Sequence, residues 1–484
     1  MLGGMAAALG RRRPNFVFLM ADDHAAYVLG ADGNPRARTP HLDRLAREGT
    51  RFSAHYCNSP VCTPSRQSLL TGQMPHSAGV TLLATPLRED QPTLARQFQK
   101  AGYTTAVFGK MHFNRPATPG LHGFHHVYTE DVLNRQWKAA VQPKPVNARV
   151  KTKPLPWKPF KDPARIWLNA DHLPYPAASG EMRAEYQIRQ AGEFLEQHRN
   201  DPFALWVSFL EPHSPFDFPI EYRGRFAPAS FAAPQIGPED AARIPLVFRG
   251  LTESDAQGIA AAYYTSVEYL DHNIGRVLRR LRELRLDEGT MVVYLADHGY
   301  DLGQHGRFEK HCGYEPALRV PLLMRYPGRI RQGAVANFTE HVDVPATIVD
   351  LMGLEPLPVM HGRSLRPYLE GKHMEGRSHI FSEYLENEEA CVRDRRWKCI
   401  YCSGRRARQD GYATDRPTPG RYSLLYDLKA DPGEFHDVSG QQQEMVASMR
   451  RMMLARFRAT HPEASREFQG SVEETLDWYL RPRA

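Results

Sequence analysis

The sequence predicts an α/β fold with a large, mixed but mostly parallel sheet between layers of helices, followed by a smaller C-terminal α+β domain. Short apolar runs alternate with stretches of helical periodicity, which is typical of parallel strands joined by helices. Acidic and basic side chains follow directly after several of these runs. With 484 residues, 42% of them hydrophobic and 24% charged, the chain has the composition of a globular protein and can bury a large core.

Four apolar runs are predicted to be strands of this sheet. They lie at residues 15–21, 103–108, 203–210 and 290–296. The side chains that follow them are Asp22 and Asp23, Lys110 and His112, His213, and Asp297 and His298. Because ligands bind at the carboxyl ends of the strands in open α/β sheets, we expect these side chains to gather at one edge and form a single site.

Helical periodicity occurs at residues 39–48, 93–101 and 260–286. The first of these stretches has Thr39 and Pro40 at its start, so we expect Thr39 to cap the helix. After about residue 369 the pattern changes. Strand-like stretches at 379–384, 391–392, 397–402 and 422–428 precede a helix near 441–460. We therefore expect a large domain at 14–369 and a C-terminal α+β subdomain at 370–484.

Residues 131–170 interrupt the α/β pattern. They contain six prolines and three tryptophans without a clear period, which predicts an irregular insertion. Their net charge of +7 equals that of the whole chain, and such local charge argues against a general nucleic-acid-binding surface. Trp137, Trp157 and Trp167 could offer flat faces to a ring at the rim of the site, with lysines for its anionic groups. The alternative is a solvated loop or a subunit contact.

The N-terminal segment, residues 1–13, has a short apolar stretch followed by three arginines. A signal peptide carries its positive charge before the apolar stretch, so the sequence as given indicates a cytoplasmic protein. If the segment is the remnant of an export signal that starts upstream, the protein is periplasmic or secreted. No apolar run is long enough for a membrane span.

Six cysteines are too few for a disulfide scaffold in a chain of this length. The pair Cys399 and Cys402 has the Cys-x-x-Cys spacing but lies in a predicted strand, which favours two half-buried strand residues over a redox pair.

The strongest local signal is Cys62-Thr63-Pro64-Ser65-Arg66. Pro64 suits the first turn of a helix whose N-terminus lies near Cys62, and a helix N-terminus favours anions. The guanidinium of Arg66 adds a bidentate contact for an oxyanion. Together with the strand-end residues and with Lys310 in the loop after Asp297, this motif describes a divalent cation beside a nucleophile, ringed by cationic groups. Such a site can transfer a tetrahedral dianion.

This motif resembles the Cys-x-Pro-Ser-Arg signature of type I sulfatases, the formylglycine-dependent family of the alkaline-phosphatase-like superfamily. The resemblance extends through Gly109-Lys110-Met111-His112 and Asp297-His298-Gly299 to Asp431-Pro432-Gly433-Glu434 near the end of the chain. It implies an alkaline-phosphatase-like fold and a hydrolase that acts on a sulfated carbohydrate, aryl or small-alcohol sulfate. It also implies a formylglycine-generating maturation enzyme as a partner, and it leaves the oligomeric state open.

The resemblance also implies a role for each site residue. Cys62 is similar to the formylglycine precursor and nucleophile, and Arg66 to the residue that supports the aldehyde hydrate. Lys110, His213 and Lys310 are similar to the residues that hold the sulfate oxygens, and His112 to the histidine that assists the hydrate during sulfate release. The implied metal ligands are Asp22, Asp23, Asp297 and His298, with the modified Cys62 completing the set. Asp297 is also a candidate for the base that activates the hydrate.

His298 stands where many members of the family have Asn. Calcium prefers oxygen ligands, whereas an imidazole nitrogen also suits a transition ion, so we expect Ca²⁺, with Mn²⁺ or Mg²⁺ as alternatives. Cys57-Asn58-Ser59-Pro60 is similar to the choline-sulfatase branch, but no counterpart of a choline pocket is recognised. Two further functions stay open, namely a phosphonate monoester or phosphodiester hydrolase on the same residues and an unmodified sulfated-glycan-binding protein.

Overall fold

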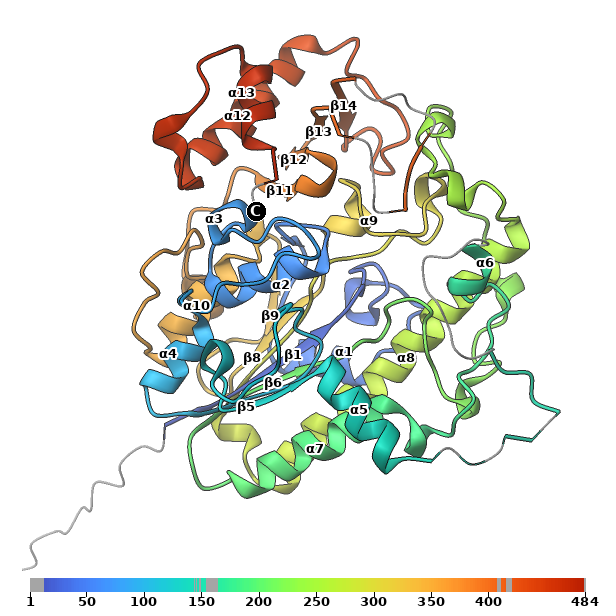
Figure 1. Ribbon diagram of the computed structural model, residues 1–484, viewed down its shortest axis with the longest axis vertical. Coiled ribbons are helices and arrows are strands. Elements are labelled where there is room, and N and C mark those ends of the chain that lie inside the picture. Colours follow the sequence, from blue (N-terminus) through green and yellow to red (C-terminus); the bar gives the residue numbers. More distant parts are fainter. Residues whose placement is uncertain are drawn as a thin grey trace, which may run out of the picture.

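The computed structural model describes residues 13–142, 144, 146–147, 149–153, 164–406, 411–414 and 420–482. Its centre is an eight-stranded sheet in the order β5-β4-β6-β1-β7-β8-β2-β9 (Figure 1). The strands are β1 (Asn15–Ala21), β2 (Thr50–Phe52), β4 (Thr104–Gly109), β5 (His126–Thr129), β6 (Phe203–Ser208), β7 (Thr290–Ala296), β8 (Leu322–Arg325) and β9 (Gly333–Val335). Within this sheet only β8 runs antiparallel to its neighbours β7 and β2, which confirms the predicted mixed, mostly parallel sheet.

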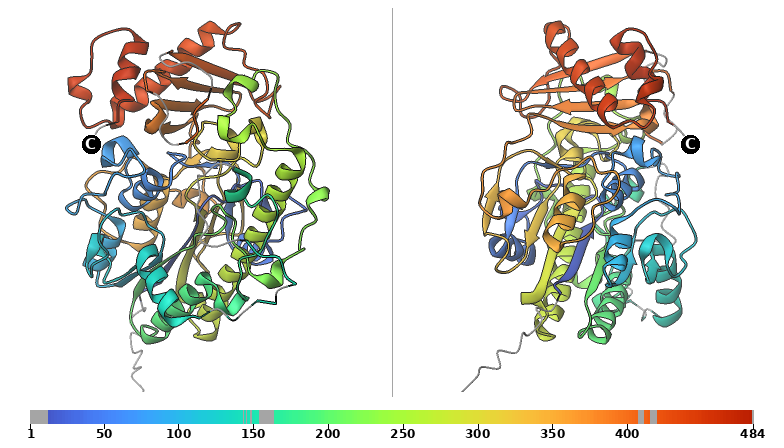
Figure 2. Two further views of the ribbon diagram at one scale, coloured as in Figure 1. Left: turned by 45° about the vertical axis from the view of Figure 1, so that its right-hand side comes forward. Right: turned by 90° about the vertical axis from the view of Figure 1, so that its left-hand side faces the viewer.

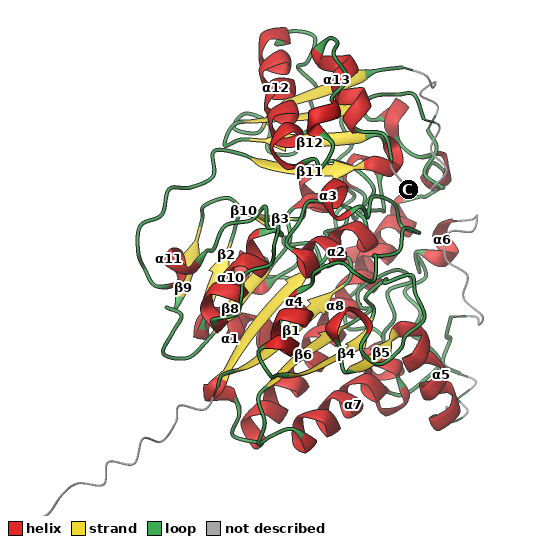
Figure 3. Cartoon of the chain, turned by 60° about the vertical axis from the view of Figure 1, so that its left-hand side comes forward, coloured by secondary structure: helices red, strands yellow, loops and turns green. Residues whose placement is uncertain are grey.

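Helices cover both faces of the sheet because the central strands are apolar on both sides. Phe16 and Phe18 of β1 pack on one face, with α2 (Cys62–Thr71), α4 (Leu94–Lys100) and α10 (Asp343–Met352). Val17 and Leu19 pack on the other face, with α1 (Pro40–Glu48), α5 (Glu130–Ala140), α7 (Arg183–Gln197) and α8 (Glu253–Glu283). The two helix layers lie on opposite sides of the strands in Figure 3. Side chains alternate across a strand, so each strand contributes to both cores.

A four-stranded antiparallel sheet forms the C-terminal part of the chain. Its order is β11 (Ile380–Tyr384), β12 (Glu389–Arg393), β13 (Trp397–Cys402) and β14 (Tyr422–Asp427). One face packs on α12 (Gln443–Thr460) and α13 (Val472–Tyr479). The other face packs on the larger part of the molecule, against residues that include Tyr56, Cys312 and Tyr314. Both views in Figure 2 place this sheet and its helices at one end of the molecule. The predicted domain boundary near residue 369 stays a prediction.

Short elements connect these layers. They are β3 (His55–Tyr56) paired with β10 (Thr339–Glu340), and the single-turn helices α3 (Pro75–Ala78), α6 (Ala164–Trp167), α9 (Glu315–Leu318) and α11 (Arg366–Leu369). Among the described residues no helix is both long and apolar enough to cross a membrane.

The predicted irregular insertion at 131–170 is wrong for its first ten residues, because α5 continues to Ala140. Leu133 and Trp137 lie four residues apart and pack on the same core, and the prolines that suggest irregular structure come only after Ala140. Trp137 is buried and its Nε1 donates to the carbonyl of Glu181 at 2.8 Å. Trp167 is buried as well. Neither indole is therefore available to a ligand, and Trp157 lies outside the described residues.

Thr39 does not cap α1 as predicted. Thr39 stands at the start of α1, but its hydroxyl donates to Asp43 at 3.0 Å and makes no cap. Asp271 of α8 caps the helix instead, because its carboxylate accepts from the backbone N–H of Leu42 at 2.8 Å.

Cys399 and Cys402 are free buried thiols. Three residues apart in one strand, they point to opposite faces of the sheet, which supports the structural interpretation.

Candidate active site

The charged side chains predicted to share an edge do meet there. β4, β6, β1 and β7 are parallel neighbours, so the residues that follow them lie together. Cys62 enters this group from the N-terminus of α2. Its Sγ lies 3.2 Å from Nε2 of His298, 3.6 Å from Oδ1 of Asp22 and 3.8 Å from Nζ of Lys110. The thiol is thus at the centre of a buried cluster of ionisable groups.

Arg66 ties the ends of several strands together. Its side chain is fully buried, and its guanidinium donates to Asp297 Oδ2 at 2.7 Å and to Asp22 Oδ2 at 2.9 Å. It also donates to Ser208 Oγ at 2.7 Å and to the carbonyl of Lys110. These hydrogen bonds are strong, because the guanidinium is charged and its planar geometry directs each N–H toward one acceptor. Arg66 therefore holds the strand-end carboxylates in fixed positions beneath Cys62.

Two lysines supply the remaining positive charge. Lys110 Nζ lies 2.5 Å from Asp22 Oδ2, and Lys310 Nζ lies 2.7 Å from Asp23 Oδ1. Burial favours the neutral amine, but the adjacent carboxylates outweigh it and raise the pKa of both lysines. Burial likewise favours protonated Asp22, yet Lys110 and Arg66 hold its pKa well below the ordinary value. The lysines therefore stay charged and hold Asp22 as a carboxylate.

The field around Cys62 favours an anion at this position. Burial and Asp22 act to raise the pKa of the Cys62 thiol, but Lys110, Lys310 and His298 outweigh them and lower it. Burial acts to lower the pKa of His298, and the charges of Asp297 and Cys62 raise it to about 9. Nδ1 of His298 lies 3.2 Å from Asp23 Oδ1 and Nε2 lies 3.2 Å from Cys62 Sγ, so each ring nitrogen faces an ionisable group.

The donor set fits a divalent cation. One ligand atom from each of Asp22, Cys62, Asp297 and His298 lies within 4.8 Å of the others, and Asp22, Asp23 and His213 form a second such group. Oδ2 of Asp23 is buried and has no hydrogen-bond partner among the residues described. Buried polar atoms are normally paired, so this oxygen is free to coordinate an ion. Carboxylates with one imidazole suit Ca²⁺, Mg²⁺ or Mn²⁺.

The two remaining predicted residues are His112 and His213. Nδ1 of His112 is 3.2 Å from Thr63 Oγ1, and Nδ1 of His213 is 2.6 Å from the carbonyl of Ser214. Burial first, and then Lys110, lower the pKa of both histidines, that of His112 to about 3. Both imidazoles are therefore neutral near pH 7 and can exchange a proton with a ligand.

Some supporting residues were missed by sequence reasoning. Ser208, the last residue of β6, accepts from Arg66 and donates to the carbonyl of Lys110 at 2.6 Å. Gln67 donates to the carbonyls of Met111 and His112 at 2.9 and 3.1 Å. Gln67 directly follows the Cys62 motif, which is a usable signal. No sequence signal indicates the role of Ser208, because its partners Arg66 and Lys110 are distant in the sequence.

The α/β architecture and this centre define a hydrolase of the alkaline-phosphatase-like class. The family model described as "Sulfatase" matches residues 14–354, and the model "N-sulphoglucosamine sulphohydrolase, C-terminal" matches residues 303–460. The chain therefore belongs to the sulfatase family and is a sulfuric ester hydrolase. This confirms the resemblance seen in the sequence.

Known proteins resemble the chain along most of its length. A choline-sulfatase of Rhizobium meliloti is 27% identical over 96% of this chain and 89% of its own. An N-acetylglucosamine-6-O-sulfatase of Bacteroides thetaiotaomicron is 26% identical, over 89% and 83%. Among solved structures, the phosphonate monoester hydrolase of Agrobacterium radiobacter has a TM-score of 0.77 and 23% identity, covering 93% of this chain and 96% of that one. The last similarity establishes the fold alone.

Proposed function

We propose that the protein cleaves a sulfate monoester with a formylglycine hydrate at position 62 and one divalent cation held by Asp22, Asp23, Asp297 and His298. The observation that carries the proposal is the position of Cys62. It lies at a helix N-terminus, within 3.8 Å of a lysine, a carboxylate and an imidazole. This environment stabilises negative charge on whatever nucleophile occupies the position.

In the cation site, the bound ion would polarise the sulfate group and favour the deprotonated nucleophile. Arg66 keeps Asp22 and Asp297 in place on either side of that site. The positive charges of Lys110 and Lys310 reduce the repulsion among the carboxylates before the ion is bound. Both lysines are also placed to hold the substrate, because Lys110 lies beside Cys62 and Lys310 beside Asp23.

The chemistry requires an aldehyde hydrate in place of the thiol. One hydroxyl of the hydrate attacks sulfur, and the S–O bond to the alcohol breaks as Lys110, His213 and Lys310 hold the sulfate oxygens. Asp297, the candidate base, accepts the proton that the attacking hydroxyl loses, and the alcohol departs with a proton taken up from water. His112 then accepts the proton of the remaining hydroxyl, the carbon–oxygen bond to sulfate breaks, and the aldehyde is restored. A serine ester would instead need a second attack at sulfur.

The decisive experiment is mass spectrometry of the peptide that contains Cys62, from protein made in its native host. We expect the mass of formylglycine. Cys62→Ala should abolish hydrolysis of an aryl sulfate. Cys57→Ala should retain most of it, because burial raises the pKa of the Cys57 thiol and its Sγ makes a weak contact to the carbonyl of Ala317 at 3.7 Å. An unmodified thiol, or an active Cys62→Ala variant, would contradict the proposal and favour a binding protein.

A second candidate is the hydrolysis of phosphonate monoesters or phosphodiesters. The same lysines and histidines can hold either tetrahedral oxyanion, and the fold is shared with a phosphonate monoester hydrolase. A sulfate ester and a phosphonate monoester of the same phenol separate the two activities. We expect the larger kcat/KM for the sulfate, and the opposite order would favour the second candidate.

A further inference from the structure

Asp23, one of the proposed cation ligands, has an unusual backbone conformation. Its φ is +68°, in the left-handed region that costs energy for a residue with a side chain, although aspartate tolerates it better than most. The residue is fully buried, and Oδ2 of its carboxylate has no hydrogen-bond partner among the described residues. A strained residue of this kind persists only where its surroundings hold it. The contacts of the Asp23 backbone therefore determine where its carboxylate lies.

Side chains from two distant parts of the chain hold the backbone of Asp23. Its N–H donates to Oδ1 of Asp297 at 3.3 Å. Its carbonyl accepts from the hydroxyl of Tyr263 in α8, and the same hydroxyl accepts from the backbone N–H of Ala25 at 2.9 Å. One phenol thus joins the carbonyl of residue 23 to the N–H of residue 25, and it fixes the bend in which Asp23 takes its left-handed conformation.

The side chain of Tyr263 is itself fixed in the core. It is fully buried, its ring stacks on that of Tyr300 with 5.7 Å between the centroids, and it makes an edge contact with Phe216 at 5.5 Å. Burial raises the pKa of the hydroxyl well above its ordinary value, so the hydroxyl stays a donor. A donor on a packed helix is a firm support for a binding site.

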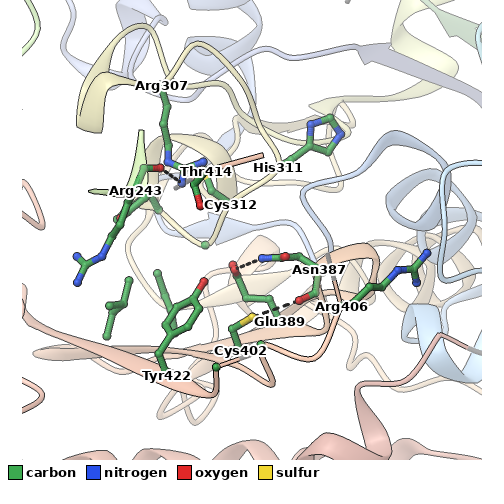
Figure 4. Close-up of a pocket in the computed structure, with 16 residues that line it drawn as sticks. Arg243, Arg307, His311, Cys312, Asn387, Glu389, Cys402, Arg406, Thr414 and Tyr422 are labelled. Atoms are coloured by element: carbon green, nitrogen blue, oxygen red, sulfur yellow. Dashed lines mark hydrogen bonds between the residues drawn. The ribbon is translucent and has the colours of Figure 1, made fainter. Parts of the chain in front are cut away.

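Lys310, which contacts the carboxylate of the same aspartate, has a less rigid support. Its Nζ lies 2.7 Å from Asp23 Oδ1, but the residue stands in the loop between β7 and α9. A cavity of about 70 Å³ lies beside that loop and is lined by residues that include Arg307 and His311 (Figure 4). Packed helices hold a site more precisely than loops do. The position of Asp23 therefore depends more on Tyr263 than on Lys310.

We propose that Tyr263 is a positioning residue of the cation site, which holds Asp23 in its left-handed conformation and so places the unpartnered Oδ2 where it can coordinate the ion. The inference rests on the proposed function, because it takes Asp23 as a ligand of the cation. The Tyr263 hydroxyl bonds to the backbone of residues 23 and 25, so its effect on the site runs through the position of Asp23. Groups that orient metal ligands commonly contribute about 10- to 100-fold to metal affinity.

The test measures the binding of Ca²⁺ and of Mn²⁺ to chelator-treated protein by titration calorimetry. Tyr263→Phe removes the hydroxyl and keeps the ring that packs on Tyr300 and Phe216. We expect this variant to raise the dissociation constant of the ion at least about tenfold. Tyr264→Phe is the matched control, because it removes a hydroxyl from the next residue of the same helix, one that accepts from Asn34 Nδ2 at 2.8 Å. The control should leave the dissociation constant nearly unchanged.

Tyr263→Phe is expected to fold, because the chain after Asp23 has further supports. Nε2 of His24 lies 2.8 Å from the carbonyl of Val28, and the backbone N–H of Ala26 donates to the carbonyl of Arg319 at 3.3 Å. The Tm of the chelator-treated protein distinguishes positioning from a purely structural role. A structural role would lower this Tm and leave the affinity for the ion as in wild type.

If Tyr263→Phe does not fold, a variant with 4-aminophenylalanine at position 263 takes its place. Its amino group still donates to the carbonyl of Asp23, so we expect a dissociation constant close to that of wild type. A tenfold loss of affinity in this variant would overturn the inference, because the donor to Asp23 is retained.

A double variant tests whether Tyr263 acts through Asp23. In an Asp23→Asn background, Tyr263→Phe should add little to the loss of affinity, because the two changes affect the same ligand. Fully additive losses would overturn the inference. So would a folded Tyr263→Phe protein that binds the ion as wild type does, or equal losses in Tyr263→Phe and Tyr264→Phe.

Failure of the proposed function gives a different result. If wild type binds the ion but hydrolyses no sulfate ester, the proposed function fails, and a loss of affinity in Tyr263→Phe still supports the role of Tyr263. If wild type hydrolyses a sulfate ester and Tyr263→Phe binds the ion equally well, the inference fails and the proposed function stands. If wild type binds neither ion, the cation site is wrong and the inference fails with it.

Discussion

At the scale of single residues, Thr63 determines which nitrogen of His112 carries the proton. The Thr63 hydroxyl donates to the carbonyl of Leu83 at 2.7 Å, so toward His112 Nδ1, 3.2 Å away, it can only accept. His112 is therefore protonated at Nδ1, and its Nε2 has a free lone pair. This is the tautomer that a base acting on the hydrate requires.

Replacement of Thr63 by Val should remove that bond while keeping the shape of the side chain. We expect kcat to fall about tenfold, a part of the contribution of a positioned base, with KM nearly unchanged. Thr63→Ser should retain most of the rate. The assay compares variants at equal formylglycine content, determined by mass spectrometry, because residue 63 adjoins Cys62, the proposed site of modification. A Val variant as fast as wild type would exclude this role for Thr63.

Residue type and position were enough to predict the centre but not its supports. Asp22, Lys110 and Asp297 each follow an apolar run, and their meeting follows from parallel strands alone. The contact between Arg66 and Ser208 was not predictable, because it depends on the distance between the ends of α2 and β6 after packing.

At the scale of elements, the pairing of β4 with β6 depends on Gly109. Its φ is +113°, and a Cβ there would lie 1.8 Å from the carbonyl oxygen of Ser208. Ala at this position would push apart the strand ends that carry Lys110 and His213. Gly120 also has a positive φ, of +88°, but an added Cβ would have no neighbour within 4 Å.

Gly109→Ala should therefore destabilise the protein much more than Gly120→Ala. We expect a loss of about 1–2 kcal/mol in the free energy of unfolding for Gly120→Ala, from backbone strain alone. Gly109→Ala should lose at least about 3 kcal/mol, since the collision adds to that strain. Denaturant titration of both variants measures the difference. Equal losses of stability in the two variants would mean that β4 and β6 accommodate the added methyl group at position 109, which would contradict this role of Gly109.

The elements that sequence reasoning located best are those whose boundaries are chemical. β1 and β7 match the predicted runs to the residue, because each is apolar after its first residue and is followed directly by an aspartate. β2 and β8 were missed because they span only three and four residues. In α5 the prolines that follow it hid a helical pattern based on Leu133 and Trp137.

At the scale of the whole molecule, the proposed cation site joins segments that are far apart in the chain. Its ligands follow β1, begin α2 and follow β7, so the ion would link residues 22, 62 and 297. The C-terminal sheet packs against the same part of the molecule through Cys312 and Tyr314, next to Lys310. The loop that carries Lys310 therefore contacts both the proposed cation site and the C-terminal sheet.

Removal of the ion should therefore lower global stability as well as activity. A ligand at about 100 times its dissociation constant stabilises the folded state by about 2.7 kcal/mol, so we expect a chelator to lower Tm by about 2–4 °C. Added Ca²⁺ or Mn²⁺ should restore it, and the more effective ion identifies the metal.

Asp23→Asn is the matched variant. It keeps the size of the side chain but removes the carboxylate, whose Oδ2 has no hydrogen-bond partner among the described residues. Its Tm should respond less to either treatment. If Tm is the same with and without chelator, and elemental analysis finds no bound metal, the carboxylates are balanced by Lys110, Lys310 and Arg66 alone and the proposed cation site is wrong.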